Sequence, residues 1–401
     1  MDLAFATIDE ALAHAIALAE RGIGHVEPNP PVGAVLLDRN LQCIGEGFHQ
    51  RFGGAHAEVE AIADTRRRFG NRAADLLRQA TLCVTLEPCA HFGKTPPCTD
   101  AILQAAIPRV VVGCVDPSPH AAGRGIERLR DAGVEVTVLD APSARELIEP
   151  FAKRVTTGRP FVLVKWAMTL DGRIATRTGH SQWISSETSR QRVHTLRGRV
   201  DAVVVGIGTV LKDDPLLTAR PPGPRRALRV VLDTHARLPL DSRLVRTAAE
   251  WPVMAAVGPT ADEDHIRRLR HCGVEVLVLP LEEQTAVASP GSDRFDECRR
   301  DAPSAAGHVS LAALLDEFGR RDFTNVLFEG GAHVFGALAD ARLIDEWHVF
   351  IAPKIVGGDG ALPPVLGRGR ERVPERPSLR SMRVECLGSD LYVTGRTVTG
   401  H

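Results

Sequence analysis

The stretch of sequence that decides the fold is Thr85-Leu86-Glu87-Pro88-Cys89-Ala90-His91-Phe92-Gly93-Lys94-Thr95-Pro96-Pro97-Cys98. It carries two cysteines, and a possible third metal ligand precedes it in His56-Ala57-Glu58. One imidazole and two thiolates suit zinc and leave the fourth tetrahedral position open for water. The charge of the metal would lower the pKa of that water, so that hydroxide exists near neutral pH.

The local context of these residues predicts how they are held. We expect His56 to open a helix over 57–68, Cys89 to follow a strand over 81–86, and Cys98 to begin a helix over 99–106. Glu58 is placed to move a proton without being a ligand, which is the arrangement of zinc deaminases. The usual deaminase spacing is Pro-Cys-x-x-Cys, whereas here Ala90 to Pro97 separate the cysteines. The alternative is a buried histidine beside unrelated core cysteines.

β-branched runs and helical patterns alternate on both sides of this stretch, which predicts an α/β fold. Segment 153–160, with its glycine and proline, is the expected boundary between a domain over 1–152 and a second over 153–401. We interpret two segments as loops, a Pro/Arg-rich one over 220–226 and a flexible one over 282–308. Strands are expected at 32–38, 81–86, 109–115 and 134–139, then at 161–167, 202–206, 227–232, 253–257, 274–279, 325–329, 346–353, 383–386 and 391–396.

Composition limits the classes of partner. The 401 residues carry a formal net charge of −1 and only 4% aromatic residues, so a basic, base-stacking nucleic-acid surface is not expected. The longest apolar runs have the length of strands, which argues against a membrane span. Residues 1–21 are interpreted as a surface helix and not as a signal peptide. Eight scattered cysteines favour thiols and metal ligation over disulfides, and hence a cytoplasmic setting.

The stretch over 85–98 closely resembles the deaminase half of the bifunctional riboflavin-biosynthesis deaminase–reductases. The second half of the chain resembles their reductase half through Leu170-Asp171-Gly172-Arg173-Ile174-Ala175, Ser181-Gln182-Trp183-Ile184, Asp213-Asp214-Pro215 and Glu329-Gly330-Gly331. The resemblance implies a cytidine-deaminase-like three-layer domain followed by a dihydrofolate-reductase-like α/β domain. It implies zinc-dependent deamination of a diamino-hydroxy-phosphoribosylamino-pyrimidine, then reduction of the ribosyl group to ribityl by NADPH. It also implies a homo-oligomer.

The family's deaminase residues carry over to matching positions here. His56, Cys89 and Cys98 would bind zinc, and Glu58 would be the catalytic proton shuttle. The residues implied to hold the substrate are Asn29, His49, His91 and Lys94. Without the resemblance, Asn29 is interpreted equally well as a turn residue before a strand, and His49 is better interpreted as a surface or core histidine.

The reductase half offers a weaker signal of its own. A glycine pair, Gly330-Gly331, follows an expected strand and opens a helical pattern, where backbone amides can cradle a pyrophosphate. In most proteins such a pair is only a tight turn, and the chain lacks a Rossmann fingerprint. The resemblance implies NADPH contacts at Ala167, Trp183, Thr209, Asp213, Thr234, Gly330, Gly331, Ala332, His333, Val334, Phe335 and Gly336. It implies substrate contacts at Ser181, Arg197, Leu217, Arg220 and Glu329.

Guanidinium groups are suited to the substrate's phosphate, which gives Arg197 and Arg220 a physical reason to be in the site. A lysine at position 165 could steady the ribose. Three other functions remain open at this stage: a deaminase whose second half has lost NADPH use, a nucleic-acid editing deaminase, and a structural zinc module. NADPH consumption, activity on single strands and the effect of Glu58→Gln separate them.

Overall fold

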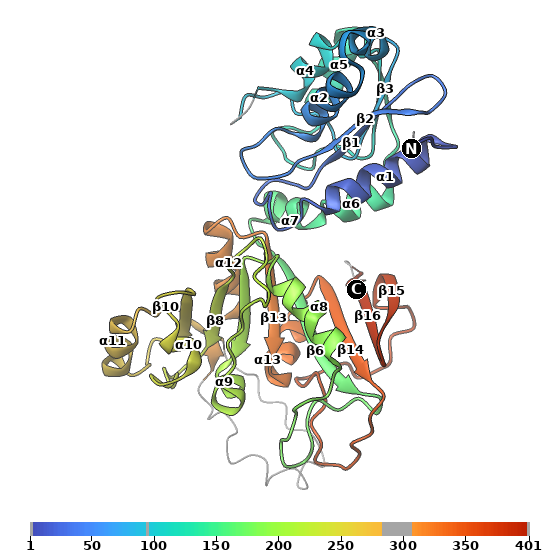
Figure 1. Cartoon of the computed structure of the whole chain (residues 1–401). Helices are drawn as coiled ribbons and strands as arrows, with labels where there is room; N and C mark the ends of the chain where they lie inside the picture. The colour runs from blue at the N-terminus through green and yellow to red at the C-terminus, as the bar shows by residue number, and fades with distance from the viewer. Residues whose placement is uncertain (1–2, 94–95, 283–306, 399–401) are drawn as a thin grey trace. The chain divides into compact units, whose positions relative to one another are not determined.

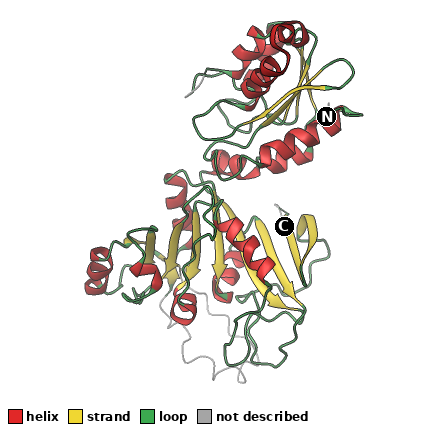
Figure 2. Ribbon diagram, viewed as in Figure 1, coloured by secondary structure: helices red, strands yellow, loops and turns green. Residues whose placement is uncertain are grey.

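A computed structural model describes residues 3–93, 96–282 and 307–398 of the chain (Figure 1). The chain divides into two units, Met1–Arg159 and Pro160–His401. Strands and helices alternate in both units (Figure 2). Among the described residues, no helix is long and apolar enough to cross a membrane.

The first unit is a five-stranded sheet in the order β2-β1-β3-β4-β5. β1 runs antiparallel to both of its neighbours, whereas β3, β4 and β5 are parallel. Its strands are β1 (Gly33–Leu37), β2 (Cys43–Phe48), β3 (Thr81–Val84), β4 (Arg109–Val112) and β5 (Glu135–Val138). Its helices are α1 (Ile8–Glu20), α2 (Ala57–Phe69), the 3-10 turn η1 (Gly70–Arg72), α3 (Ala73–Leu77), α4 (Cys98–Gln104), α5 (Arg124–Asp131), α6 (Pro142–Leu147) and α7 (Glu149–Thr157).

Helices cover both faces of this sheet because β1 is apolar on both sides. Ala34 and Leu36 pack with residues of α2, α4 and α5, while Val35 and Leu37 pack with residues of α1. α6 contributes Ala144 to a further cluster that also contacts α1. The result is the three-layer α/β/α arrangement that the sequence predicts, with α2 and α4 side by side on one face (Figure 1).

The second unit is built on a nine-stranded sheet in the order β10-β9-β8-β7-β13-β6-β14-β16-β15. Its strands are β6 (Phe161–Thr169), β7 (Ala202–Gly206), β8 (Leu228–Leu232), β9 (Val253–Val257), β10 (Glu275–Val278), β13 (Asn325–Gly330), β14 (Glu346–Ala352), β15 (Leu379–Leu387) and β16 (Asp390–Thr397). A small pair, β11 (Leu281–Glu282) and β12 (His308–Val309), stands apart. Its helices are α8 (Glu187–Arg197), α9 (Ile207–Asp213), α10 (Arg243–Arg246), α11 (Glu263–His271), α12 (Leu311–Arg320) and α13 (Ala332–Asp340).

In the order of the sheet, all strands from β10 at one side through β9, β8, β7, β13 and β6 to β14 are parallel. Their carboxyl ends therefore lie at one edge. Only β16 runs the other way, antiparallel to both of its neighbours, β14 and β15. β6 shows how the faces are filled, because Phe161 and Leu163 pack with α9, α10 and α11, whereas Val162 and Val164 pack with α12 and α13. Open α/β sheets bind ligands at the carboxyl ends of their strands. That edge is therefore where a cofactor is expected.

Each strand that the β-branched runs predict is present, with ends shifted by a few residues. The division between the two units falls inside the expected boundary segment 153–160, but most of that segment is helical, because α7 continues to Thr157. Gly158 has φ of +71° and ends this helix. The glycine in the sequence therefore indicates the C-cap of a helix. The expected boundary at 152/153 thus falls inside α7, and the two units divide after Arg159. Residues 220–226 form a loop as expected. Of the segment 282–308, residues 283–306 lie outside the described residues.

Candidate active sites

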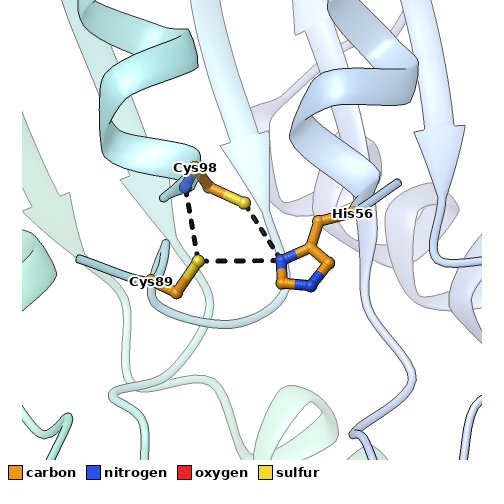
Figure 3. Close-up of side chains that lie close together, drawn as sticks. All are labelled: His56, Cys89 and Cys98. Carbon is orange, nitrogen blue, oxygen red and sulfur yellow. Dashed lines mark hydrogen bonds between the residues drawn. The ribbon is translucent and has the colours of Figure 1, made fainter. Parts of the chain in front are cut away.

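Three possible metal ligands meet at the carboxyl end of β3. His56 precedes α2, Cys89 lies in the loop after β3, and Cys98 is the first residue of α4 (Figure 3). The His56 Nδ1 atom lies 3.1 Å from the Cys98 Sγ and 3.7 Å from the Cys89 Sγ. All three ligand atoms lie within 4.8 Å of one another. Neighbouring ligand atoms around a tetrahedral zinc are roughly 3.5–3.8 Å apart, so this cluster has the dimensions of a zinc site.

Hydrogen bonds within the cluster prepare one thiolate. The Cys98 thiol donates to Cys89 and, with further hydrogen bonds from His56 and from the Cys98 backbone N–H, lowers the pKa of Cys89 to about 4. The same interaction, together with burial, raises the pKa of Cys98. The hydrogen bond with Cys89 also raises the pKa of His56. A bound cation removes the cost of holding two thiolates together, because a coordinating thiol is deprotonated outright.

Glu58 lies in the first turn of α2 beside this cluster, and only 3% of it is exposed. Its Oε2 atom is buried without a hydrogen-bond partner among the described residues. Burial raises the pKa of this carboxyl group. An unpartnered buried carboxyl oxygen costs free energy unless a ligand satisfies it. The carboxyl group of Glu58 is therefore free to exchange a proton with a bound molecule.

Asn29 and His49 meet on the same side of the first unit. The Asn29 Nδ2 atom lies 3.2 Å from the His49 Nε2, and the other imidazole nitrogen of His49 lies 2.9 Å from the Ala55 carbonyl oxygen. The His49 ring stands edge-on to the His56 ring with 5.1 Å between centroids. Burial lowers the pKa of His49, which favours a neutral imidazole. His91 is exposed, and Lys94 lies outside the described residues.

Glu87 has a structural role that the motif alone did not reveal. The residue is 5% exposed, and its carboxylate accepts backbone N–H groups at the start of α5 and in the loop before it, from Asp116, Gly123, Gly125 and Ile126. A Cβ on Gly125 would lie 1.9 Å from the Pro88 carbonyl oxygen, so the backbone there must approach closely. These contacts fix the loop that carries Cys89. Since the partners of Glu87 lie 29 to 39 residues further along the chain, no local spacing predicts them.

Replacing Glu87 with Gln should weaken zinc binding about 10- to 100-fold, which is the usual effect of losing a residue that supports a metal ligand. An amide has one acceptor oxygen where the carboxylate has two, and its NH₂ group would face backbone N–H donors. Competition with a chromophoric chelator measures the affinity. Glu127→Gln, an exposed position on α5, is the matched control. Equal zinc affinities for the two variants would show that the hydrogen bonds of Glu87 do not support the metal site.

A buried charge cluster lies in the second unit. Arg197 at the end of α8 makes a bidentate pair with Glu329 of β13, with N···O distances of 2.6 and 2.8 Å. The Lys165 Nζ atom of β6 lies 4.0 Å from the same carboxylate. The Glu329 side chain is only 4% exposed. Burial alone would raise the pKa of Glu329, but Arg197 and Lys165 hold it below its usual range, and burial lowers the pKa of Lys165.

The two arginines of the implied substrate site differ. Besides its pair with Glu329, Arg197 donates to the Thr218 carbonyl oxygen at 3.2 Å, so all three of its nitrogens have protein partners. Arg220 is exposed and donates to the Thr218 hydroxyl at 3.0 Å. Arg220 is thus the one that retains donors facing outward. Leu217 is 3% exposed within the main core, and Ser181 is half-buried in the loop before α8.

The glycine pair of the implied cofactor site lies at the carboxyl end of β13. Gly331 precedes α13 with φ of +92°, which suits glycine, and its neighbour Gly330 contacts α9. A Cβ on Gly330 would lie 2.6 Å from the Thr209 Oγ1. The Thr209 side chain thus packs directly against the Gly330 backbone, which is possible only because Gly330 lacks a side chain. The backbone amides at the start of α13, next to this contact, are the groups that would receive a dinucleotide pyrophosphate.

The other residues that the resemblance assigns to the cofactor lie along the edge formed by the carboxyl ends of the strands, and in α13. Ala167 lies near the end of β6, Asp213 ends α9, and Thr234 follows β8 with its hydroxyl accepting from the Val309 N–H. Trp183 is 64% exposed, with the Arg190 guanidinium 4.7 Å from its ring. The first turns of α13 hold Ala332, His333, Val334 and Phe335, of which Ala332 and Phe335 are buried. Gly336 lies inside α13, where a Cβ would meet the Leu366 carbonyl oxygen at 1.8 Å, so it serves helix packing.

Comparison with known proteins covers nearly the whole chain. Residues 6–114 match the cytidine and deoxycytidylate deaminase zinc-binding region, and residues 160–393 match the RibD C-terminal domain. The riboflavin biosynthesis protein RibD of Actinobacillus pleuropneumoniae is 36% identical over 95% of this chain and 93% of its own. RibD of Escherichia coli is 34% identical over 95% of this chain and 96% of its own.

A solved structure from Thermotoga maritima, a diaminohydroxyphosphoribosylaminopyrimidine deaminase/5-amino-6-(5-phosphoribosylamino)uracil reductase, is 36% identical and covers 98% of this chain and 99% of its own, with a TM-score of 0.75. A structure of Acinetobacter baumannii RibD is 31% identical, with the same coverage and a TM-score of 0.76. Both halves of the chain thus match in order and at full length. The chain belongs to the RibD family, the bifunctional deaminases and reductases of riboflavin biosynthesis.

Proposed function

We propose that this chain performs both reactions for which the Thermotoga relative is named, the deamination in its first unit and the reduction in its second. In this proposal His56, Cys89 and Cys98 hold the zinc ion. The observation that carries it is the meeting of these three ligand atoms within 4.8 Å, beside the buried carboxyl group of Glu58. The residues present fit a zinc ion by donor type and spacing.

When bound, zinc supplies a Lewis acid that lowers the pKa of a water molecule. Glu58 accepts a proton from the attacking water and delivers it to the amino group, which leaves as ammonia while the ring gains a carbonyl oxygen. Asn29 would offer its amide to the pyrimidine, and the neutral His49, whose ring nitrogens face Asn29 and the Ala55 carbonyl oxygen, would hold that amide in place. Burial raises the pKa of Glu58, so the carboxyl group can hold the proton that it takes from the water until that proton passes to the leaving amine.

When bound in the second unit, NADPH would supply the hydride for reduction of the ribosyl group to ribityl. Opening the ribose ring also requires a proton for the ring oxygen. Lys165 can donate it, because burial lowers the pKa of its ammonium group. Glu329 holds Lys165 and Arg197 in place, and Arg220 offers its outward donors to the phosphate.

Gly330→Ala is expected to raise the KM for NADPH about 10-fold or more, because the new methyl group would lie 2.6 Å from the Thr209 hydroxyl and would displace the glycine turn at the start of α13. Steady-state kinetics of NADPH oxidation measure the change, while ammonia release from the first unit should be unaffected. Gly357→Ala would be a poor control, because φ is +64° at Gly357 and a side chain there would strain the backbone. Gly208→Ala is the matched control, because a Cβ at Gly208 would lie in open space. An unchanged KM would mean that NADPH binds elsewhere.

The proposed function is tested by giving the purified protein the diaminopyrimidine substrate and measuring ammonia and NADPH oxidation in parallel. We expect one ammonia per substrate, followed by one NADPH. Chelation of zinc should stop ammonia release but leave NADPH oxidation intact when the deaminated intermediate is added. Ammonia release without NADPH oxidation would favour a deaminase whose second unit has lost its activity.

Finer properties are part of the same proposal. We propose a cytoplasmic location, since the seven cysteines among the described residues are all free thiols, as a reducing compartment favours. With small-molecule substrates and a net charge of −1, we propose no nucleic-acid partner. We also propose that the chain forms a homo-oligomer.

A further inference from the structure

One residue of the second unit meets three basic side chains. Thr218 lies in the loop between α9 and β8, and its carbonyl oxygen accepts a hydrogen bond from Arg197 at 3.2 Å. The same oxygen lies 3.2 Å from the Nδ1 atom of His194. The Thr218 hydroxyl group accepts from Arg220 at 3.0 Å. The two arginines belong to the proposed substrate site, whereas neither proposed reaction uses His194.

His194 has one ring nitrogen to offer. It lies on α8 three residues before Arg197, so the two side chains share one face of the helix. The Thr218 carbonyl oxygen can only accept, so Nδ1 carries the hydrogen atom of the neutral ring. The Nε2 atom then has a lone pair, and no described residue forms a hydrogen bond with it. The ring is half-buried, so Nε2 is the atom that can take up a proton and donate to a ligand.

The charges around this ring are unbalanced. The groups that act on it are the guanidiniums of Arg197 and Arg220 and the carboxylate of Glu329. Arg243 acts in turn on Arg220, and Lys165 shares Glu329 with Arg197. Cations therefore outnumber the buried carboxylate. A local excess of positive charge attracts an anionic ligand.

The same neighbours set the protonation of the ring. Burial lowers the pKa of His194, and Arg197 and Arg220 lower it further, whereas the Thr218 carbonyl oxygen and Glu329 act in the opposite direction. The imidazole is therefore neutral near pH 7 in the free protein. A phosphate group carries a charge of about −1.5 to −2 at that pH. Bound beside the two guanidiniums, it would offset their repulsion and raise the pKa of the ring.

We propose that His194 is a third phosphate-binding residue of the reductase substrate site, and that its Nε2 atom takes up a proton from solvent when the phosphate group binds. The protonated ring donates through Nε2 to a phosphate oxygen, while Nδ1 keeps its hydrogen bond to Thr218. Arg220 supplies guanidinium donors to the same group. This inference rests on the proposed reductase function and adds to it a residue that selects the phosphorylated, dianionic substrate.

Proton uptake gives substrate binding a pH dependence of fixed sign. The pKa of His194 is higher in the complex than in the free protein, where it lies below its usual value of 6.5. Its contribution to affinity is fully present below the pKa of the free protein and is lost as pH rises through the pKa of the complex. With one proton taken up per substrate, affinity falls by up to about 10-fold per pH unit between these two values.

His194→Asn tests this dependence, because the amide retains an N–H that can donate to the Thr218 carbonyl oxygen but cannot be protonated. The KM for the deaminated substrate is measured by NADPH oxidation in both proteins at a series of pH values. The KM of the variant should exceed that of the wild type about 10-fold or more near pH 6, because a charge-assisted hydrogen bond is lost. The ratio of the two KM values should fall toward one as pH rises. Ionisation of the substrate itself cancels in this ratio.

His271→Asn, a change of an exposed histidine at the end of α11, is the matched control and should have the wild-type KM at every pH. A KM ratio for His194→Asn that is constant with pH would indicate a purely structural role and overturn the proposal. Equal KM values for wild type and His194→Asn would also overturn it. NADPH oxidation by the wild-type chain tests the proposed function separately, so the two failures are distinguishable.

Calorimetry counts the proton directly. The deaminated substrate is titrated into the chain with NADP⁺, which has no hydride to transfer, in buffers of different ionisation enthalpy. Near pH 7, the wild type should take up more protons per substrate than His194→Asn, by up to about one. Ammonia release and the circular dichroism spectrum verify folding, and His194→Gln replaces the variant if it does not fold. An equal proton count in wild type and variant would contradict the proposal.

Discussion

Glu58→Gln is expected to lower the deaminase kcat by about 10²- to 10⁴-fold, the usual contribution of a general acid–base group. The amide has nearly the same shape but cannot take up the proton of the attacking water or pass it to the leaving amine. Zinc content should remain near one ion per chain, because Glu58 is not among the three clustered ligands. Ammonia release and metal analysis of the same sample measure both quantities.

Glu60→Gln is the matched control for this variant, since both glutamates lie in the first turn of α2. It should retain ammonia release. NADPH oxidation with the deaminated intermediate should be the same in both variants, because the change lies in the other unit. Full deaminase activity in Glu58→Gln would indicate that zinc has only a structural role. Loss of zinc along with activity would make Glu58 a ligand and contradict the assignment.

Glu329→Gln is expected to abolish most reductase activity and to destabilise the second unit by about 3–5 kcal/mol. The side chain is 4% exposed and pairs with Arg197 and Lys165, so its neutralisation leaves two buried cations without a counter-charge. Lys165 should then lose its proton more readily, which removes the proposed donor. Thermal unfolding and NADPH oxidation measure the two effects.

Glu317→Gln is the control for Glu329→Gln. Glu317 also pairs with two cations, Arg320 and Arg321, but on the surface of α12. Surface pairs contribute about 0–1 kcal/mol, so this variant should unfold at nearly the wild-type temperature. Deaminase activity should persist in both. A Glu329→Gln protein that retains wild-type stability and NADPH oxidation would show that the buried cluster is neither a structural nor a catalytic unit.

The cluster of metal ligands could be predicted from the sequence, because the residues of each of its parts lie close together along the chain. His56 and Glu58 lie on one helix start, and Cys89 and Cys98 bracket one loop, so residue type and spacing were enough to predict the cluster that the structure shows. The Arg197–Glu329 pair joins residues 132 positions apart. Only the order of β6, β13 and β7 in the folded sheet brings them together, and no periodicity encodes that order.

β2 was not predicted, for a reason visible in its packing. Its sequence, Cys43-Ile44-Gly45-Glu46-Gly47-Phe48, contains two glycines, which have low strand propensity. In the fold, a Cβ on Gly47 would lie 2.5 Å from the Ala61 backbone nitrogen. The glycine therefore allows α2 to lie directly on the strand. Packing against α2 requires a glycine at this position. Because glycine has a low strand propensity, the sequence did not indicate a strand here.

X-ray absorption at the zinc edge of the loaded protein tests the central claim most directly. The account predicts one nitrogen at about 2.0 Å, two sulfurs at about 2.3 Å and one light oxygen scatterer at the fourth position. Cys89→Ser should remove one sulfur from this shell. A fourth protein ligand, seen as a third sulfur or a second imidazole, would contradict a catalytic site and leave the ion a structural role.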